Sequence, residues 1–329
     1  MNRKETVKNP GRSEGVKKLR VGVVGVGHLG QHHARIYSQM PDVDLVGVAD
    51  TQEARGKEIS EKYKTKYFSN YLDLIPKVDA LSIAVPTQFH YEVTHQCLQN
   101  GIDVLLEKPI SATVEEAESL ISEAGKNKII FQIGHLERYN RAFLKIKGLI
   151  RNPRFIENHR IGPFAARGTD VNVILDLMIH DIDIILSLTA SPLTEIRAVG
   201  IPVLSREVDI VNARLEFKSG CIANMTASRV SLEKMRKIRI FQPEAYISLD
   251  YQNQEVTIAR KVKENDTTRI VVDHPVVEKE EPLKLELHDF VLNCLNRTAP
   301  EISGVEGKEA LRVAEEIAKI AIQQSRKFL

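Results

Sequence analysis

The chain has 329 residues, 43% hydrophobic and 27% charged, which is typical of a globular protein of about two domains. Its 46 basic and 44 acidic residues leave a formal charge of +2, which excludes binding of nucleic acid or membranes through a bulk electrostatic field. The three cysteines are widely spaced and form neither a disulfide framework nor a zinc motif, so we expect no metal site and a reducing, cytoplasmic location. No apolar run reaches the roughly 18 residues that a membrane span needs.

The first segment, residues 1–17, is basic and polar and contains Pro10, Gly11 and Gly15. It lacks the apolar core of a secretory signal, and its glutamates do not fit a transit peptide. We therefore expect a disordered tail ahead of the folded chain.

Residues 18–140 alternate short apolar runs with helical patterns. Buried strands are predicted at 19–25, 44–49, 78–85, 102–106 and 128–134. Helices are predicted at 28–39, 52–63 and 87–100, and another begins at the capping box Thr113–Glu116. Strands that alternate with helices of this length pair in parallel through right-handed crossovers. The sequence thus predicts a doubly wound, Rossmann-type α/β domain.

Residues 141–329 show a different pattern. Alternating runs with turn signals lie at 195–203, 208–217, 221–228, 238–242 and 245–249, and helical patterns lie at 171–189, 283–296 and 305–327. Lys218–Gly220 predicts a hairpin turn between two of the runs. We predict an α+β domain with a largely antiparallel open sheet. Because few helices are left to cover its apolar face, we expect a homodimer or homotetramer formed through that sheet.

The run Gly25–Gly30 (GVGHLG) has the spacing G-x-G-x-x-G between the first predicted strand and the first predicted helix. In that position its glycines permit a tight turn, a close approach of a pyrophosphate and packing of helix on strand. Asp50, twenty residues after Gly30, would accept hydrogen bonds from ribose hydroxyls and repel a 2′-phosphate. The motif predicts binding of NAD rather than NADP, with Arg55 as the nearby residue able to meet a 2′-phosphate.

Two further segments carry ionisable residues. Glu107-Lys108-Pro109 closes a predicted strand at the carboxyl edge, where doubly wound sheets bind ligands, although its spacing alone fits a structural turn better. Asp176 and His180 lie four residues apart, on one face of an otherwise apolar helical pattern. Buried ionisable groups are costly unless they are paired or functional, so this pair indicates either a satisfied core histidine or an acid–base site.

Taken together, these segments give the chain a family resemblance. After the tail, nearly the whole chain resembles the Gfo/Idh/MocA family of nicotinamide-dependent sugar oxidoreductases. The matching segments are GVGHLGQHHAR (25–35), Asp50, AVPTQFH (84–90), EKP (107–109), GHLERYN (134–140) and DLMIHDID (176–183). The glycine loop alone is not specific, but the combination of EKP with D-x-x-x-H-D is.

The resemblance implies roles for individual residues. Lys108 matches the lysine that bonds substrate and nicotinamide ribose, His180 the general acid or base at the reacting hydroxyl, and Asp176 the carboxylate that orients it. The cofactor-binding residues that we expect are Gly25, Gly27, His28, Leu29, Gly30, Asp50, Pro86, Thr87, His90, Glu107 and Lys108. The substrate-binding residues that we expect are Lys108, Arg138, Tyr139, Asn140, Arg160, Arg167, Asp176 and His180.

The physical chemistry agrees with these roles. A histidine with an ordinary pKa near 6.5 suits removal of a hydroxyl proton near neutral pH. A lysine ammonium stabilises developing alkoxide charge, while the cofactor supplies the electron chemistry.

The substrate is indicated less sharply. GHLERYN and DLMIHDIDI look most like the subgroup that oxidises UDP-linked N-acetylhexosamines, typically at C3 of UDP-N-acetylglucosamine. Five arginines are expected near the domain junction, where guanidinium forks suit a diphosphate: Arg138, Arg141, Arg154, Arg160 and Arg167. The alternative is that these arginines are solvated surface charges with no role in substrate binding.

Three alternatives stay open at this point. The first is dehydrogenation of a free sugar or inositol, which carries no phosphate. The second is a glycoside hydrolase that oxidises C3 transiently and returns its NAD unchanged. The third is a non-catalytic NAD sensor, which would need neither Lys108 nor His180.

Overall fold

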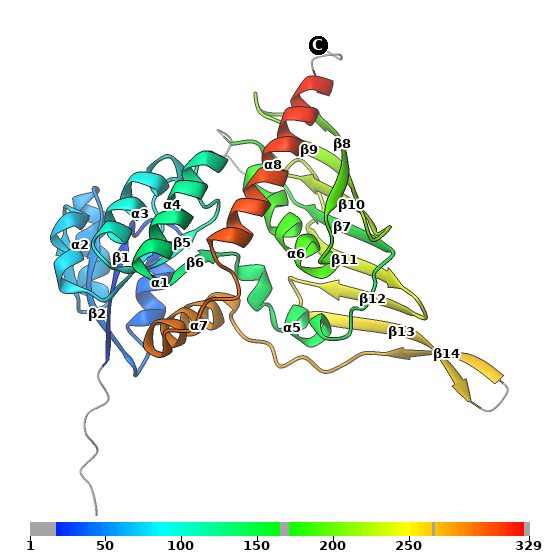
Figure 1. Ribbon diagram of the computed structural model, residues 1–329, viewed down its shortest axis with the longest axis horizontal. Helices are drawn as coiled ribbons and strands as arrows, with labels where there is room; N and C mark the ends of the chain where they lie inside the picture. The colour runs from blue at the N-terminus through cyan, green and yellow to red at the C-terminus, as the bar shows by residue number, and fades with distance from the viewer. Residues whose placement is uncertain (1–17, 165–170, 265–266, 326–329) are drawn as a thin grey trace, which may run out of the picture.

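The computed structural model describes residues 18–164, 171–264 and 267–325. Figure 1 shows two sheets side by side, each with helices packed on it. The predicted tail, residues 1–17, lies outside the described residues. No helix in the described ranges is long and apolar enough to cross a membrane.

The first domain is built on a parallel sheet of six strands in the order β3-β2-β1-β4-β5-β6. Its strands are β1 (Leu19–Val24), β2 (Val43–Ala49), β3 (Lys66–Phe68), β4 (Ala80–Ile83), β5 (Asp103–Glu107) and β6 (Phe131–Gly134). Its helices are α1 (Gly30–Tyr37), α2 (Glu53–Lys62), α3 (His90–Gln99) and α4 (Val114–Asn127). The doubly wound Rossmann prediction is confirmed, and the strand order reverses between β1 and β4, where such folds bind ligands.

Local signals explain much of this domain. The predicted capping box is present, since Thr113 Oγ1 accepts the Glu116 N–H at 3.3 Å and the Glu116 carboxylate accepts the Thr113 N–H at 3.3 Å. The short strand β3 was not predicted, because three residues give no measurable alternation.

The second domain holds a sheet of eight strands in the order β14-β13-β12-β11-β7-β10-β9-β8, in which only β7 and β10 pair in parallel. Its strands are β7 (Phe155–Ile161), β8 (Leu193–Ile201), β9 (Ile210–Phe217), β10 (Ile222–Ser228), β11 (Met235–Gln242), β12 (Ala245–Asp250), β13 (Glu255–Glu264) and β14 (Thr267–Asp273). The antiparallel prediction is confirmed, as is the turn at Lys218–Gly220, which joins the paired strands β9 and β10.

The expectation of an uncovered apolar face was wrong. The helices α5 (Arg141–Lys147), α6 (Ile179–Thr189) and α8 (Gly304–Ser325) pack on that face and enclose the larger core (Figure 1). On β9 and β10 the opposite face carries polar residues such as Asn212 and Asn224, which alternate with buried residues. The covered inner face therefore gives no reason for subunit association.

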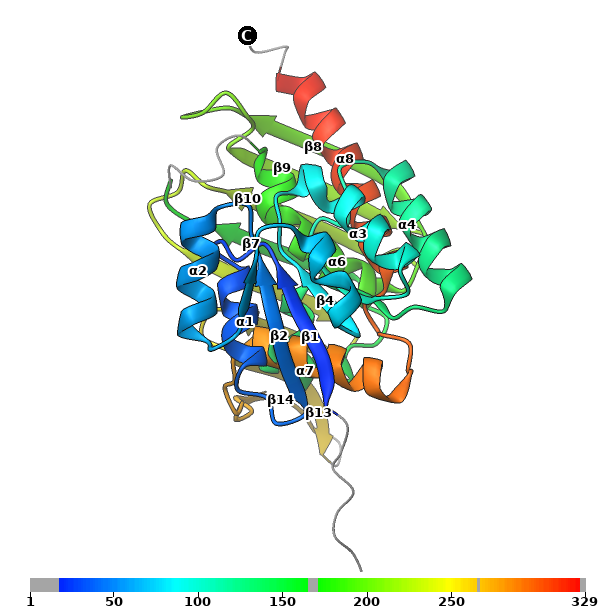
Figure 2. The ribbon, with the colours of Figure 1, turned by 90° about the vertical axis from the view of Figure 1, so that its left-hand side faces the viewer.

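The helix α7 (Pro282–Asn296) returns to the first domain. Its Leu287, Phe290 and Val291 are buried in one cluster with Val21 of β1 and Tyr37 of α1. Figure 2 looks onto this domain, with α7 behind the strands. One helix of the predicted second domain, residues 141–329, is thus buried against the first domain.

Candidate active site

The glycine-rich turn leads from β1 into α1. Gly25 has a φ of +81°, in the left-handed region, and a Cβ there would lie 2.8 Å from the Ala84 carbonyl oxygen. A Cβ at Gly30 would lie 1.8 Å from the Gly25 carbonyl oxygen, whereas at Gly27 it would meet no described atom within 4 Å. Two glycines thus fix the turn, and the third leaves backbone open beside it. The loop fits a dinucleotide whose pyrophosphate approaches Gly27.

Asp50 holds the end of β2 against this loop. Its Oδ2 accepts the Val26 N–H at 2.8 Å and its Oδ1 accepts the Gln52 N–H at 2.8 Å. The Arg55 guanidinium is engaged as well, because it donates to the Val26 carbonyl oxygen at 3.0 Å and to Glu58 at 2.7 Å. A carboxylate therefore lies beside the loop, and the one nearby arginine considered for a 2′-phosphate is already bonded.

The other expected cofactor residues differ in their surroundings. His28 and Leu29 lie on the exposed side of the glycine turn, and Pro86 and Thr87 begin a short 3₁₀ turn after β4. His90 is buried, with Nδ1 2.7 Å from the Pro109 carbonyl oxygen and Nε2 2.8 Å from the Val85 carbonyl oxygen. Both ring nitrogens of His90 therefore contact backbone oxygens, and this histidine holds the loop after β4 against Pro109. Its contact with the cofactor stays a prediction.

Lys108, at the end of β5, reaches across to the second domain. Its Nζ donates to the Asp176 main-chain oxygen at 2.7 Å and lies 3.9 Å from Asp176 Oδ1. Burial lowers the pKa of this ammonium, against the opposing charges of Asp176 and Glu107. The EKP element and the Asp176–His180 element therefore meet, as the resemblance implied.

Asp176 lies in a π-helical turn, Ile174–Met178, that precedes α6. The helical pattern predicted at 171–189 is therefore present, but this turn is wider than an α-helical one. Such turns are frequent at functional sites. The Asp176 side chain is 43% exposed, and no hydrogen bond joins it to His180 among the described residues. Asp176 therefore faces the site from the domain junction.

His180 lies at the start of α6, partly exposed, and its Nδ1 is buried without a hydrogen-bond partner in the described ranges. Burial, followed by the positive charges of Lys108 and Arg160, holds the pKa of His180 well below its ordinary value. The imidazole is therefore neutral near neutral pH, which is the form that accepts a proton.

Two buried groups near these residues were missed from the sequence. His135 follows β6, and its ring lies edge-on to that of His180 with a centroid separation of 6.4 Å; within the described structure neither His135 nitrogen has a partner. His33 of α1 lies 2.6 Å from Ser82 Oγ and 3.0 Å from Glu107 Oε1. The Glu107 carboxylate thus bonds inward to His33. The sequence separation from His33 to Glu107 gave no signal of this pairing.

Two expected substrate arginines are bonded elsewhere. Arg138 forms a bidentate pair with Asp183, with both N–O distances at 2.7 Å. Arg160 forms a bidentate pair with Asp181 at 2.9 and 2.8 Å, and also donates to Glu137 at 2.9 Å. All five side chains are buried. Acids of α6 therefore hold both guanidinium groups, and Glu137 of the 3₁₀ turn Leu136–Tyr139 also holds Arg160. Binding of a diphosphate by Arg138 and Arg160 stays a prediction.

The other expected substrate residues also have structural partners. Tyr139 Oη donates to Asp289 at 2.7 Å, and Asn140 caps α5 by accepting the Ala142 N–H at 3.0 Å. Arg141 pairs with Glu280, Arg154 donates to the Ser219 carbonyl oxygen at 3.3 Å, and Arg167 lies outside the described residues. Of the described residues in the expected set, Lys108, Asp176 and His180 converge.

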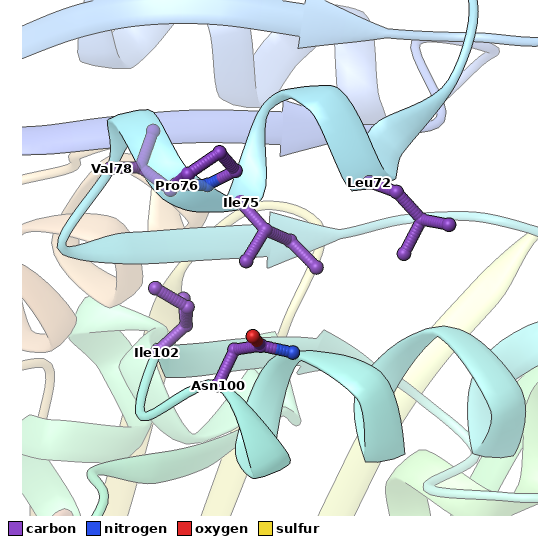
Figure 3. Close-up of a pocket in the computed structure, with 6 residues that line it drawn as sticks. All are labelled: Leu72, Ile75, Pro76, Val78, Asn100 and Ile102. Atoms are coloured by element: carbon purple, nitrogen blue, oxygen red, sulfur yellow. The ribbon is translucent and has the colours of Figure 1, made fainter.

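A separate hollow of about 490 Å³ lies on the first domain (Figure 3). Its lining residues are Leu72, Ile75, Pro76, Val78, Asn100 and Ile102. Val78 and Ile102 lie just before β4 and β5, so the hollow is at the amino edge of the sheet, opposite the edge that carries Lys108. It is not part of the candidate active site.

Comparison with known proteins places this geometry in a family. A family model described as an oxidoreductase family with an NAD-binding Rossmann fold matches residues 19–135, and a second, described as a GFO/IDH/MocA C-terminal domain, matches residues 146–248. A UDP-N-acetylglucosamine 3-dehydrogenase from Acidithiobacillus ferrooxidans is 34% identical over 310 residues, covering 93% of this chain and 97% of the relative.

Two further similarities extend over almost the whole chain. A solved structure of the Acidithiobacillus ferrooxidans enzyme has a TM-score of 0.89 at 32% identity, covering 94% of this chain and 99% of that chain. A myo-inositol 2-dehydrogenase from Thermotoga maritima is 26% identical over 327 residues, covering 94% of this chain and 97% of the relative. With both domains matched, the chain belongs to the Gfo/Idh/MocA family of oxidoreductases and carries its NAD-binding Rossmann domain.

Proposed function

We propose that the chain oxidises a secondary hydroxyl of a UDP-linked N-acetylhexosamine, with C3 of UDP-N-acetylglucosamine as the reacting carbon and NAD preferred over NADP. The observation that carries the chemistry is the contact of Lys108 Nζ with Asp176 beside a neutral His180. The nearly full-length similarity to a UDP-N-acetylglucosamine 3-dehydrogenase supports the substrate.

In this proposal the protein residues manage the proton and the charge. The neutral imidazole of His180 removes the hydroxyl proton, and the Lys108 ammonium stabilises the negative charge that develops on the oxygen. Asp176 fixes Lys108 through its main-chain oxygen and faces the same site. The loop at Gly25–Gly30 and the Asp50 carboxylate would hold NAD, which supplies the hydride acceptor when bound.

A second candidate is oxidation of an inositol, favoured by the similarity to a myo-inositol 2-dehydrogenase over 94% of this chain. Incubation of the pure protein with NAD and a panel of nucleotide sugars, free sugars and inositols separates the two. The proposal expects mass spectrometry to show loss of two hydrogen atoms from UDP-N-acetylglucosamine, with one NADH formed per product. Oxidation of inositol alone would contradict it, and cleavage without net NADH would identify a hydrolase instead.

We also propose that the chain forms a homodimer or homotetramer through the outer face of the second sheet. Phe155, Phe241 and Tyr246 lie together there, with ring centroids 5.6 and 5.1 Å apart. Aromatic residues are enriched at subunit interfaces. Light scattering at micromolar concentration is expected to give at least twice the monomer mass, and a monomer would contradict this part of the proposal.

A further inference from the structure

The geometry points to Arg236 of β11 as the anion-binding residue of the substrate site, the group that holds a phosphate of a nucleotide sugar. This inference rests on the proposed function, because it names the side chain that would separate nucleotide sugars from neutral polyols.

The strand pairing fixes where Arg236 lies. In the antiparallel pair β11–β7, Arg236 is directly opposite Arg160. Residues directly opposite one another point to the same face of a sheet, and Arg160 lies on the face under α6, where it bonds Asp181. Ile238 and Ile240, two and four residues along β11, are buried in the core on that face. Arg236 therefore lies on the inner side of the sheet, next to the start of α6.

The partners of Arg236 are what single it out. It is half-buried, yet in the described ranges no carboxylate lies within ion-pair distance of it and no hydrogen bond from its guanidinium is present. Glu137 and Asp181, the nearby acids, are bonded to Arg160 instead. A like charge directly opposite on the neighbouring strand is destabilising, and a partly buried charge without a partner is costly. An anion bound at Arg236 would offset both the repulsion from Arg160 and the cost of burying an unpaired charge.

The same residue lies within electrostatic reach of the reacting groups. Its positive charge contributes to the low pKa of His180, after the larger effects of burial and of other positive charges. Burial lowers the pKa of Arg236 in turn, and the Asp176 carboxylate acts on that pKa in the opposite direction. Its guanidinium is thus close enough to His180 and Asp176 for their charges to interact. A guanidinium fork matches two oxygens of a phosphate, whereas a free sugar or inositol offers it only neutral hydroxyls.

The test compares Arg236→Met, Arg236→Lys and the matched control Arg260→Met. Arg260 lies on β13 of the same sheet, two strands away from β11. It is exposed and pairs with Asp273 at 2.6 Å. Calorimetric titration with UDP is expected to give a Kd about 10- to 100-fold weaker for Arg236→Met, an intermediate Kd for Arg236→Lys and an unchanged Kd for Arg260→Met. With UDP-N-acetylglucosamine, KM is expected to rise in the same order, with kcat within about threefold of wild type, because the phosphate lies away from the reacting carbon.

Two controls separate folding from binding. All variants are expected to keep the wild-type Tm within a few degrees and the wild-type affinity for NAD, since NAD binds at the glycine loop. Equal UDP affinity in wild type and Arg236→Met, or equal losses in Arg236→Met and Arg260→Met, would overturn the inference while wild-type oxidation of UDP-N-acetylglucosamine leaves the proposed function intact. A wild-type protein that neither binds UDP nor oxidises a nucleotide sugar would overturn the proposed function itself, and with it the inference.

Discussion

Lys108 and Asp176 meet across the junction of the two domains, where the Lys108 ammonium donates to the Asp176 main-chain oxygen at 2.7 Å. The contact joins the end of a Rossmann strand to a π-helical turn 68 residues later in the chain. A lysine held by a backbone oxygen keeps its position whatever the protonation state of the neighbouring carboxylate. The site is thereby preorganised from both domains, with His180 beside it.

Asp50 leads to a prediction on cofactor choice. Its carboxylate lies beside the glycine loop, and Arg55 is bonded to the Val26 carbonyl oxygen and to Glu58. NAD(H) is therefore expected to bind at least tenfold more tightly than NADP(H), about 1.4 kcal/mol. Calorimetric titration of both cofactors checks this, and equal or reversed affinities would count against the role of Asp50.

The pH profile of kcat/KM follows from two pKa directions. Because His180 acts as a neutral base and its pKa is held well below the ordinary value, oxidation is expected to persist into acid and to fall only below the usual range of histidine. Because burial lowers the pKa of Lys108, the alkaline loss is expected below the usual range of lysine. Steady-state rates from acid to alkaline pH test both limbs, and a single loss at the ordinary histidine pKa would contradict the assignment.

Arg138 is expected to matter for stability. Replacement by Leu leaves Asp183 buried without its bidentate partner, and breaking a buried pair in this way costs about 3 to 5 kcal/mol. Urea unfolding of Arg138→Leu is the measurement. If Arg138 were instead a substrate ligand, the variant would unfold like wild type and lose only affinity for substrate.

Glu286 of α7 is fully buried, and neither carboxylate oxygen has a hydrogen-bond partner in the described part of the chain. Burial, with the nearby Glu107 and Asp289 charges, raises its pKa well above the ordinary value. The folded state therefore keeps a proton that the unfolded state releases above pH 4.5, so this residue lowers stability as pH rises.

Glu286→Gln removes that dependence while keeping the size of the side chain. The variant is expected to gain stability over wild type by about 1.4 kcal/mol per pH unit, from the ordinary glutamate pKa up to the raised one. Denaturation of both proteins at pH 5 and pH 8 gives the comparison. A difference in stability that stays constant with pH would show that Glu286 is ionised in the folded protein.

Local signals in the sequence predicted much of the fold. The strands of the first domain are continuous apolar runs, and Thr113 with Glu116 marks a helix start within four residues. Strand β7 was not predicted, because Asn158 and Arg160 point inward at positions where an alternating strand pattern has apolar residues. The packing of α7 on the first domain was not predicted either. Its Phe290 packs against strands more than 200 residues earlier, and no local sequence pattern indicates such a contact.

The site divides in the same way. Lys108, Asp176 and His180 lie in short sequence motifs, so they could be predicted as one site. The role of each arginine could not be predicted, because it depends on which acid lies next to it in the folded protein. Arg160 forms an ion pair with Asp181, while Arg236 on the adjacent strand has no ion-pair partner in the described ranges. His135 and His180 likewise come together only because the segment that follows β6 packs against α6.

The most direct test of the central claim, that Lys108 and His180 act on the reacting hydroxyl, is single-turnover hydride transfer by Lys108→Ala, His180→Ala and the double variant. Each single variant is expected to bind NAD nearly as wild type does but to turn over about 10² to 10⁴ more slowly. Asp176→Asn is expected to slow hydride transfer less than either alanine variant if Asp176 only positions its neighbours.

The double variant is expected to lose less than the product of the two single losses, because both residues serve one transition state. Tm measured on the same samples separates this from a packing role, in which His180→Ala would lose stability and its folded fraction would turn over normally. Slow hydride transfer in a stable His180→Ala protein is the predicted result, and a stable His180→Ala protein with unchanged hydride transfer would contradict the account.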